Sequence, residues 1–102
     1  MKNVVVLAKA ADDLQSAREF YDAHDADLGE YWLSSVFAAL DRLAVFSGIH
    51  SRRFGYHRMI AAPFPLGIYY REHRGNALIV AILDLRRDPK WIQKQLRRRP
   101  NN

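Results

Sequence analysis

The chain has 102 residues, 49% hydrophobic and 26% charged, which predicts one domain spanning residues 1–102 with a single modest core. No cysteine is present, so disulfides, thiolate metal sites and cysteine nucleophiles are excluded. Residues 1–51 hold 4 Lys or Arg against 8 Asp or Glu, and residues 52–102 hold 12 against 3, so the basic C-terminal half is expected to meet a polyanionic or acidic partner.

The N-terminal segment predicts a strand followed by a helix. A short β-branched run at residues 4–8 is typical of a buried strand. It is shorter than a signal-peptide core or a membrane span, so a cytoplasmic protein with no membrane association is expected. Ala10, Leu14, Ala17 and Tyr21 then recur at helical spacing and share one face of a first helix.

A second helix is expected to begin near Leu28, with Asp27 and Glu30 as its capping pair. Its apolar stripe ends at Ser47-Gly48 and consists of Leu28, Trp32, Val36, Ala39, Leu40, Leu43 and Phe46. The short connection predicts an antiparallel helical hairpin. Aromatic residues are usually buried, so Phe20, Trp32 and Phe37 are expected in the core between this hairpin and a sheet.

The second half of the chain predicts strands and a final helix. The period shortens toward two over residues 53–61, 66–71 and 77–83, with turns at residues 63–65 and 73–76, which indicates an antiparallel meander. The apolar run at 77–83 is typical of a central strand. Asp88-Pro89 predicts the start of a basic helix through Gln95, and residues 100–102 are expected to be frayed.

These elements predict an α+β fold of order β-α-α-β-β-β-α. An N-terminal strand and a two-helix hairpin pack on a mainly antiparallel sheet of about four strands, and a short helix ends the chain. Trp91, in that helix, is expected to pack back on the sheet. The basic run at residues 97–99 is interpreted as a solvated end, with phosphate contact as the alternative.

Two interpretations of the arginines remain open. Metal-free phosphodiester cleavage needs cations and proton-transfer groups. Arg58, Arg71, Arg86 and Arg87 could be the cations, and His57, Tyr70 or His73 could move the proton, but their spacing selects no trio. The alternative is that the arginines are exposed on the sheet rim. The histidines lack metal-ligand spacing and the glycines form no phosphate loop, so no metal and no cofactor is expected.

Several segments together resemble the RelE/ParE superfamily of type II toxins over roughly residues 4–92. The similar segments are ADDL at residues 11–14, leading to Phe20-Tyr21, then LGEYWL at 28–33, FPLGIYYR at 64–71 and RRDPKW at 86–91. The YYR strand and the RRDP segment are closer to the ParE-like, plasmid-stabilisation branch. Many relatives have a histidine where this chain has Asp84, and no tyrosine follows Tyr70, so the resemblance to RelE-like nucleases is weaker.

The resemblance implies a small bacterial toxin that is encoded beside a cognate antitoxin, which wraps it and can form a hetero-oligomer with it. The favoured expectation is a ParE-like, non-enzymatic toxin that binds a protein such as DNA gyrase through Arg86, Arg87, Lys90 and Trp91. The alternative is a RelE-like, metal-independent mRNA endonuclease acting on the ribosome, with Arg58, Arg71 and Arg86 as catalytic residues. A third possibility is a non-toxic basic RNA-binding domain, although no recognised RNA-binding motif is present.

Overall fold

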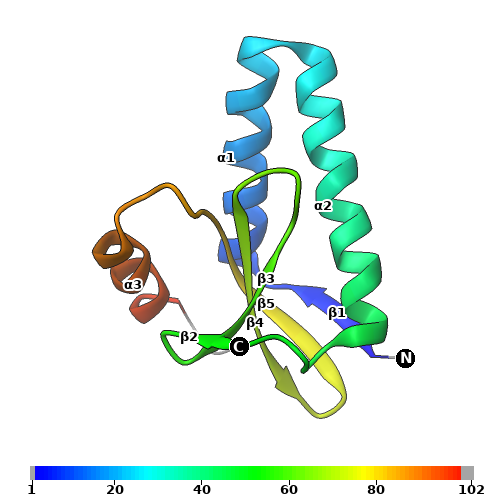
Figure 1. Ribbon diagram of the computed structural model, residues 1–102, viewed down its shortest axis with the longest axis vertical. Helices are drawn as coiled ribbons and strands as arrows, with labels where there is room; N and C mark the ends of the chain where they lie inside the picture. Colours follow the sequence, from blue (N-terminus) through cyan, green and yellow to red (C-terminus); the bar gives the residue numbers. More distant parts are fainter. Residues whose placement is uncertain (1, 100–102) are drawn as a thin grey trace.

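The computed structural model describes residues 2–99 and shows an α+β fold of helices packed on one sheet (Figure 1). Strand β1 (Asn3–Val6) leads into a hairpin of two helices, α1 (Ala8–His24) and α2 (Ala26–Phe46). The strands β2 (Arg52–Arg53), β3 (Tyr56–Ile60), β4 (Leu66–His73) and β5 (Asn76–Asp84) follow, and then α3 (Pro89–Arg97). The frayed end expected at residues 100–102 lies outside the described residues.

The sheet is mixed and has the strand order β1-β5-β4-β3-β2. β1 pairs with β5 in parallel, and the remaining pairs are antiparallel. The central position predicted for residues 77–83 is confirmed, because β5 lies between β1 and β4. The predicted strand at 53–61 is instead two strands, since Phe54 and Gly55 have φ values of 56° and 87° and turn the chain between the short β2 and β3.

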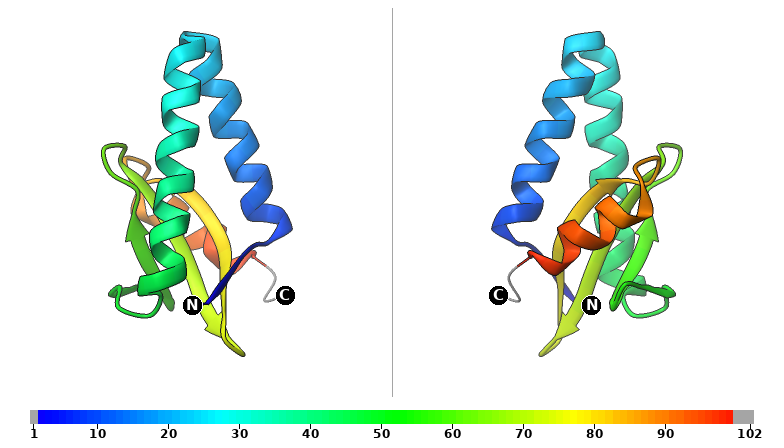
Figure 2. Two further views of the ribbon diagram at one scale, coloured as in Figure 1. Left: turned by 90° about the vertical axis from the view of Figure 1, so that its right-hand side faces the viewer. Right: turned by 90° about the vertical axis from the view of Figure 1, so that its left-hand side faces the viewer.

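The two faces of the sheet carry different layers (Figure 2). The helical hairpin covers one face and encloses the main core, whose largest buried members include Trp32, Leu43, Ile68, Tyr70 and Ile79. α3 lies on the opposite face over a smaller core, which consists of Tyr69, Val80, Ala81, Leu83, Ile92 and Leu96. Trp91 is half-buried against this smaller core, as predicted.

Only one of the three aromatic residues expected in the core is buried. Trp32 is fully buried, but Phe20 and Phe37 are 55% and 52% exposed. Phe37 follows the buried Val36, and one residue along a helix corresponds to a rotation of about 100°. Phe37 therefore lies beside the stripe that faces the sheet. Phe20 is likewise one residue away from the partly buried Tyr21, so its side chain also points away from the core.

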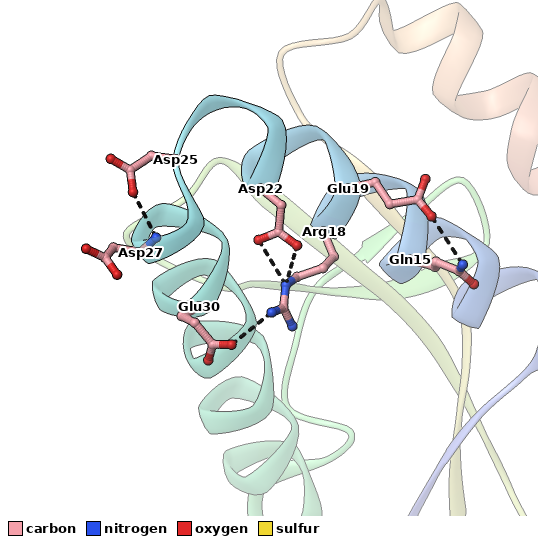
Figure 3. Close-up of polar contacts among 7 residues, drawn as sticks. All are labelled: Gln15, Arg18, Glu19, Asp22, Asp25, Asp27 and Glu30. Atoms are coloured by element: carbon pink, nitrogen blue, oxygen red, sulfur yellow. Dashed lines mark hydrogen bonds and ion pairs between the residues drawn. The ribbon is translucent and has the colours of Figure 1, made fainter.

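Polar contacts define the tip of the helical hairpin (Figure 3). The carboxylate of Asp25 accepts the backbone N–H of Asp27 at 2.8 Å and caps α2, which therefore starts at Ala26. The predicted capping pair is wrong, because Glu30 instead accepts a bond of 2.8 Å from Arg18 of α1. Gly29 allows the helices to come close here, since a Cβ at this position would lie 1.7 Å from Oδ1 of Asp22.

A bulge in β5 determines which residues of this strand face each of the two cores. Tyr69 of β4 pairs with Ala81, while Tyr70 pairs with Ile79, so Val80 is an extra residue in β5. Val80 and Ala81 consequently both contribute to the smaller core, whereas Ile79 and Ile82 belong to the main core. An extra residue of this kind disturbs the regular ladder of hydrogen bonds and bends the strand.

An ion pair between α1 and the segment after α3 holds the bulge. Asp13 accepts the backbone N–H of Ile82 at 3.0 Å, and Arg99 donates to Asp13 at 2.6 Å and 3.0 Å. Arg99 also donates to the carbonyl of Val80 at 3.2 Å. The side chain of Arg99 is only 8% exposed, so the prediction of a solvated end is wrong at this residue. Its charge is stabilised inside the protein by a carboxylate distant in sequence.

We expect Asp13→Ala to lower the free energy of unfolding by about 3 kcal/mol, because it leaves a buried guanidinium and the Ile82 N–H without their acceptor. Urea denaturation measures the change. Asp12→Ala is the matched control, since Asp12 is exposed and surface substitutions usually change stability by less than about 0.5 kcal/mol. Equal stability of the two variants would contradict a stabilising role of this ion pair.

Candidate functional site

Three of the four residues predicted to bind a target border one cleft. It has a volume of about 430 Å³ and lies between α1, the β3–β4 loop and the β5–α3 loop. Arg86, Arg87 and Trp91 line it, whereas Lys90 is exposed on the first turn of α3 and does not line it. The other lining residues are Asp13, Ser16, Ala17, Phe20, Tyr21, Trp32, Phe64, Pro65, Leu66, Ile82, Leu83 and Asp84. The cleft thus joins segments from both halves of the sequence.

Aromatic rings in mutual contact form much of the cleft wall. Tyr21 stacks on Trp32 with 5.6 Å between ring centroids and meets Phe64 edge-on at 5.5 Å. Phe20 lies edge-on to Tyr21 at 5.3 Å. Tyr21 and Phe64 were not among the site residues predicted from the sequence, and Phe20 was expected in the core. The one sequence signal for Phe64 is its place between Pro63 and Pro65 in a turn.

Arginines at one side of the cleft are held by the loop that precedes α3. The carboxylate of Asp84 accepts the backbone N–H of Arg86 at 2.8 Å and its Nη2 at 2.7 Å. The side-chain hydrogen bond from Arg86 is the main cause of the lowered pKa of Asp84. Arg87 stacks over Trp91, with its guanidinium carbon 3.8 Å from the ring centroid. Asp88 caps α3 through a bond of 2.9 Å from the N–H of Lys90, as predicted.

The structure separates the three arginines considered for phosphodiester cleavage. Arg58 pairs with Tyr69, and Arg71 lies two residues beyond Tyr69, so both share the sheet face that carries α3. Arg86 follows Asp84, which pairs with Leu66. Leu66 lies five residues from Arg71 in β4, or about 17 Å along the strand. Arg58 and Arg71 are therefore brought together, while Arg86 stands at the cleft.

Tyr70 and His57, two of the possible proton-transfer groups, form hydrogen bonds with a loop on the opposite face of the sheet. Tyr70 is fully buried, and its hydroxyl accepts the N–H of Gly48 at 2.9 Å and bonds Nδ1 of His50 at 2.5 Å. His57 stacks on Tyr70 with 5.1 Å between centroids, and its Nδ1 donates to the carbonyl of His50 at 2.6 Å. These contacts anchor the loop between α2 and β2. His73, the third possible group, is exposed at the end of β4.

Comparison with known proteins adds no family to this description: the sequence matches no family model, and no curated protein is significantly similar to it. Within residues 2–99, no helix has both the length and the apolar character needed to cross a membrane.

The loop that Tyr70 anchors is expected to make stability depend on pH. Burial, and to a smaller extent the charge of His57, lower the pKa of His50 from its ordinary value of 6.5. The unfolded chain consequently binds a proton at His50 at higher pH than the folded chain does. The contribution of His50 to stability is therefore fully present above about pH 6.5 and is lost as the pH falls below it.

Urea denaturation at several pH values measures this decline. In His50→Gln the part of it due to His50 is expected to disappear, and His73→Gln is the matched control because His73 is exposed. An unchanged pH dependence in His50→Gln would contradict a contribution from the burial of His50.

Proposed function

We propose that this protein is the toxin of a type II toxin–antitoxin system. It is ParE-like and acts in the bacterial cytoplasm by binding a protein target such as DNA gyrase. A cognate antitoxin neutralises it by wrapping it, with contacts on the helical hairpin, and forms a hetero-oligomer with it. The sequence resemblance and the aromatic cleft are the two supports for this proposal.

The cleft carries the proposal because its composition suits a protein interface. Aromatic residues and arginine are enriched where proteins bind each other, and a few such residues supply most of the binding energy. Trp91 with Arg87 stacked on it stands beside Phe20, Tyr21 and Phe64. A hydrophobic side chain of a target can enter the cleft while a nearby carboxylate of that target pairs with Arg87.

Arg87→Gln is expected to weaken growth inhibition and to reduce affinity for a purified target about tenfold or more, as for loss of an interface hot spot. Lys94→Gln is the matched control, because Lys94 is an exposed cation of α3 that does not line the cleft. Survival after induction without antitoxin and target binding in solution are the measurements. If both variants inhibit growth like the unmodified protein, Arg87 has no role in toxicity.

The target class is tested by pulse-labelling DNA and protein synthesis during the first minutes of induction. Early loss of DNA synthesis is the expected outcome for a gyrase-directed toxin. Early loss of protein synthesis with DNA labelling intact would instead favour the mRNA endonuclease. If neither is lost, the toxin proposal itself fails.

One observation favours the endonuclease as a second candidate. Arg58 and Arg71 lie on the same face of the sheet, and neither forms an ion pair with a carboxylate of residues 2–99. The Nε atom of Arg71 is buried without a hydrogen-bond partner, and such a donor is costly unless a ligand or water satisfies it. For a nuclease, Arg71→Ala should reduce mRNA cleavage by orders of magnitude while antitoxin binding persists.

A further inference from the structure

Both tryptophans of the chain line the cleft, and one of them has a polar atom without a partner. The chain contains two tryptophans, Trp32 and Trp91. Trp32 is fully buried, and its indole Nε1 is a buried donor that forms no hydrogen bond with any atom of residues 2–99. Such a donor is costly unless water or a ligand accepts from it. Because Trp32 is part of the cleft wall, an acceptor that enters the cleft can satisfy this donor.

One positive charge in the cleft wall has no carboxylate partner. Asp13 of the wall is bound to Arg99, which itself lines a second, smaller hollow between α3 and the β2–β3 turn. Asp84, the other acidic residue of the wall, is bound to Arg86. Arg87 forms no ion pair with any carboxylate of residues 2–99. The charges of the wall therefore favour an occupant with a single negative charge.

Arg87 is positioned by an aromatic ring. Its guanidinium carbon lies over Trp91, 3.8 Å from the ring centroid. A guanidinium is planar and carries its N–H donors at its edge, in a geometry that matches a carboxylate. Stacking occupies the face of this group and leaves the donors at its edge available. Arg87 is thus oriented to bind a carboxylate that enters the cleft.

The rest of the cleft wall consists mainly of apolar and aromatic side chains. Tyr21 contacts both Trp32 and Phe64, and the 55% exposed Phe20 packs edge-on against Tyr21. Aromatic rings pack favourably in offset or edge-on contact with one another. Pockets for small molecules have volumes of about 300–1,000 Å³ and combine an apolar wall with a few polar groups. The cleft, at about 430 Å³, has both properties.

We infer that the cleft binds a small aromatic carboxylic acid. The ring of this ligand lies against Tyr21 and Phe64, and its carboxylate accepts hydrogen bonds from Arg87. An oxygen on the ring beside the carboxylate accepts a hydrogen bond from Nε1 of Trp32. The inference goes beyond the proposed function and does not rest on it. A ligand of this class would compete with a protein target for the cleft.

Salicylate tests the inference, because it carries a carboxylate and a hydroxyl on neighbouring atoms of one ring. Isotopically labelled protein gives two indole N–H signals in its NMR spectrum, one for each tryptophan, and Trp91→Phe identifies them. Salicylate should move both signals along one saturable binding curve. Benzoate, which lacks the hydroxyl, should move the Trp32 signal less. A Trp32 signal that does not respond to salicylate, or responds equally to benzoate, would overturn the inference.

The contact between the carboxylate and Arg87 is tested from both sides. Arg87→Gln should weaken salicylate binding about tenfold or more, because it removes a charge-assisted hydrogen bond. Lys94→Gln is the matched control and should bind salicylate like the unmodified protein, since Lys94 is an exposed cation of α3 outside the cleft. Salicylamide, which is neutral, should bind the unmodified protein about tenfold or more weakly than salicylate. Equal binding of the two compounds would overturn the inference whether or not the Arg87 variant folds.

A peptide distinguishes a free acid from the end of a polypeptide chain. Acetylated glycylphenylalanine has an aromatic ring and a terminal carboxylate but no oxygen on its ring. It should displace salicylate less well than unlabelled salicylate does. Stronger displacement by the peptide would overturn the free-acid inference in favour of a polypeptide C-terminus. None of these measurements uses toxicity, so their failure leaves the proposed function to its own test.

Discussion

The bulge in β5 determines how the two faces of the sheet are occupied. Because Val80 is an extra residue opposite Tyr69, Val80 and Ala81 both face α3, and Ile82 returns to the side of the helical hairpin. The polar groups at the bulge are bonded by Asp13 and Arg99. One ion pair therefore links α1, the central strand and the end of α3, and the positions of both hollows depend on this arrangement.

The cleft and the second hollow differ in the residues that line them. The cleft lies at the end of β5 where α1, the Phe64 loop and the Arg86–Trp91 segment meet, and aromatic rings dominate its wall. A second, smaller hollow lies between α3 and the β2–β3 turn and is lined by Phe54, Tyr56, Gln93, Leu96, Arg97 and Arg99. α3 contributes Trp91 to the first and Arg97 to the second. A single short helix thus borders both hollows.

Sequence patterns predicted the elements well and the burial of single residues less well. The helical hairpin, the central strand and the Asp88 cap were all visible because period and capping are local properties. The burial of Arg99 was not, because it requires Asp13, 86 positions away, to supply the opposite charge. The predictions for Phe20 and Phe37 were wrong for a related reason. Their apolar character suggested burial, but each side chain lies next to the buried stripe of its helix and remains exposed.

Some residues of the candidate site could likewise be predicted from the sequence, and others could not. Arg86, Arg87 and Trp91 could be selected from the sequence, because they lie in one of the segments that resemble the RelE/ParE superfamily. Phe20, Tyr21 and Phe64 could not be joined to them, because α1 and the β3–β4 loop meet that segment only when the sheet has formed. Arg58 and Arg71 were candidates in the sequence, but only strand register placed them on one face of the sheet.

The sequence by itself determined the α+β class, the order of the main elements and the basic character of the second half, because periodicity, capping and charge are properties of the chain. Only the tertiary structure decided which cations are free to bind a partner. Arg99 and Arg86 are held by Asp13 and Asp84, whereas Arg58, Arg71 and Arg97 have no carboxylate partner among the described residues. The physical reason is that the interaction between two charges depends on their distance in space, which folding sets and the order of residues does not reveal.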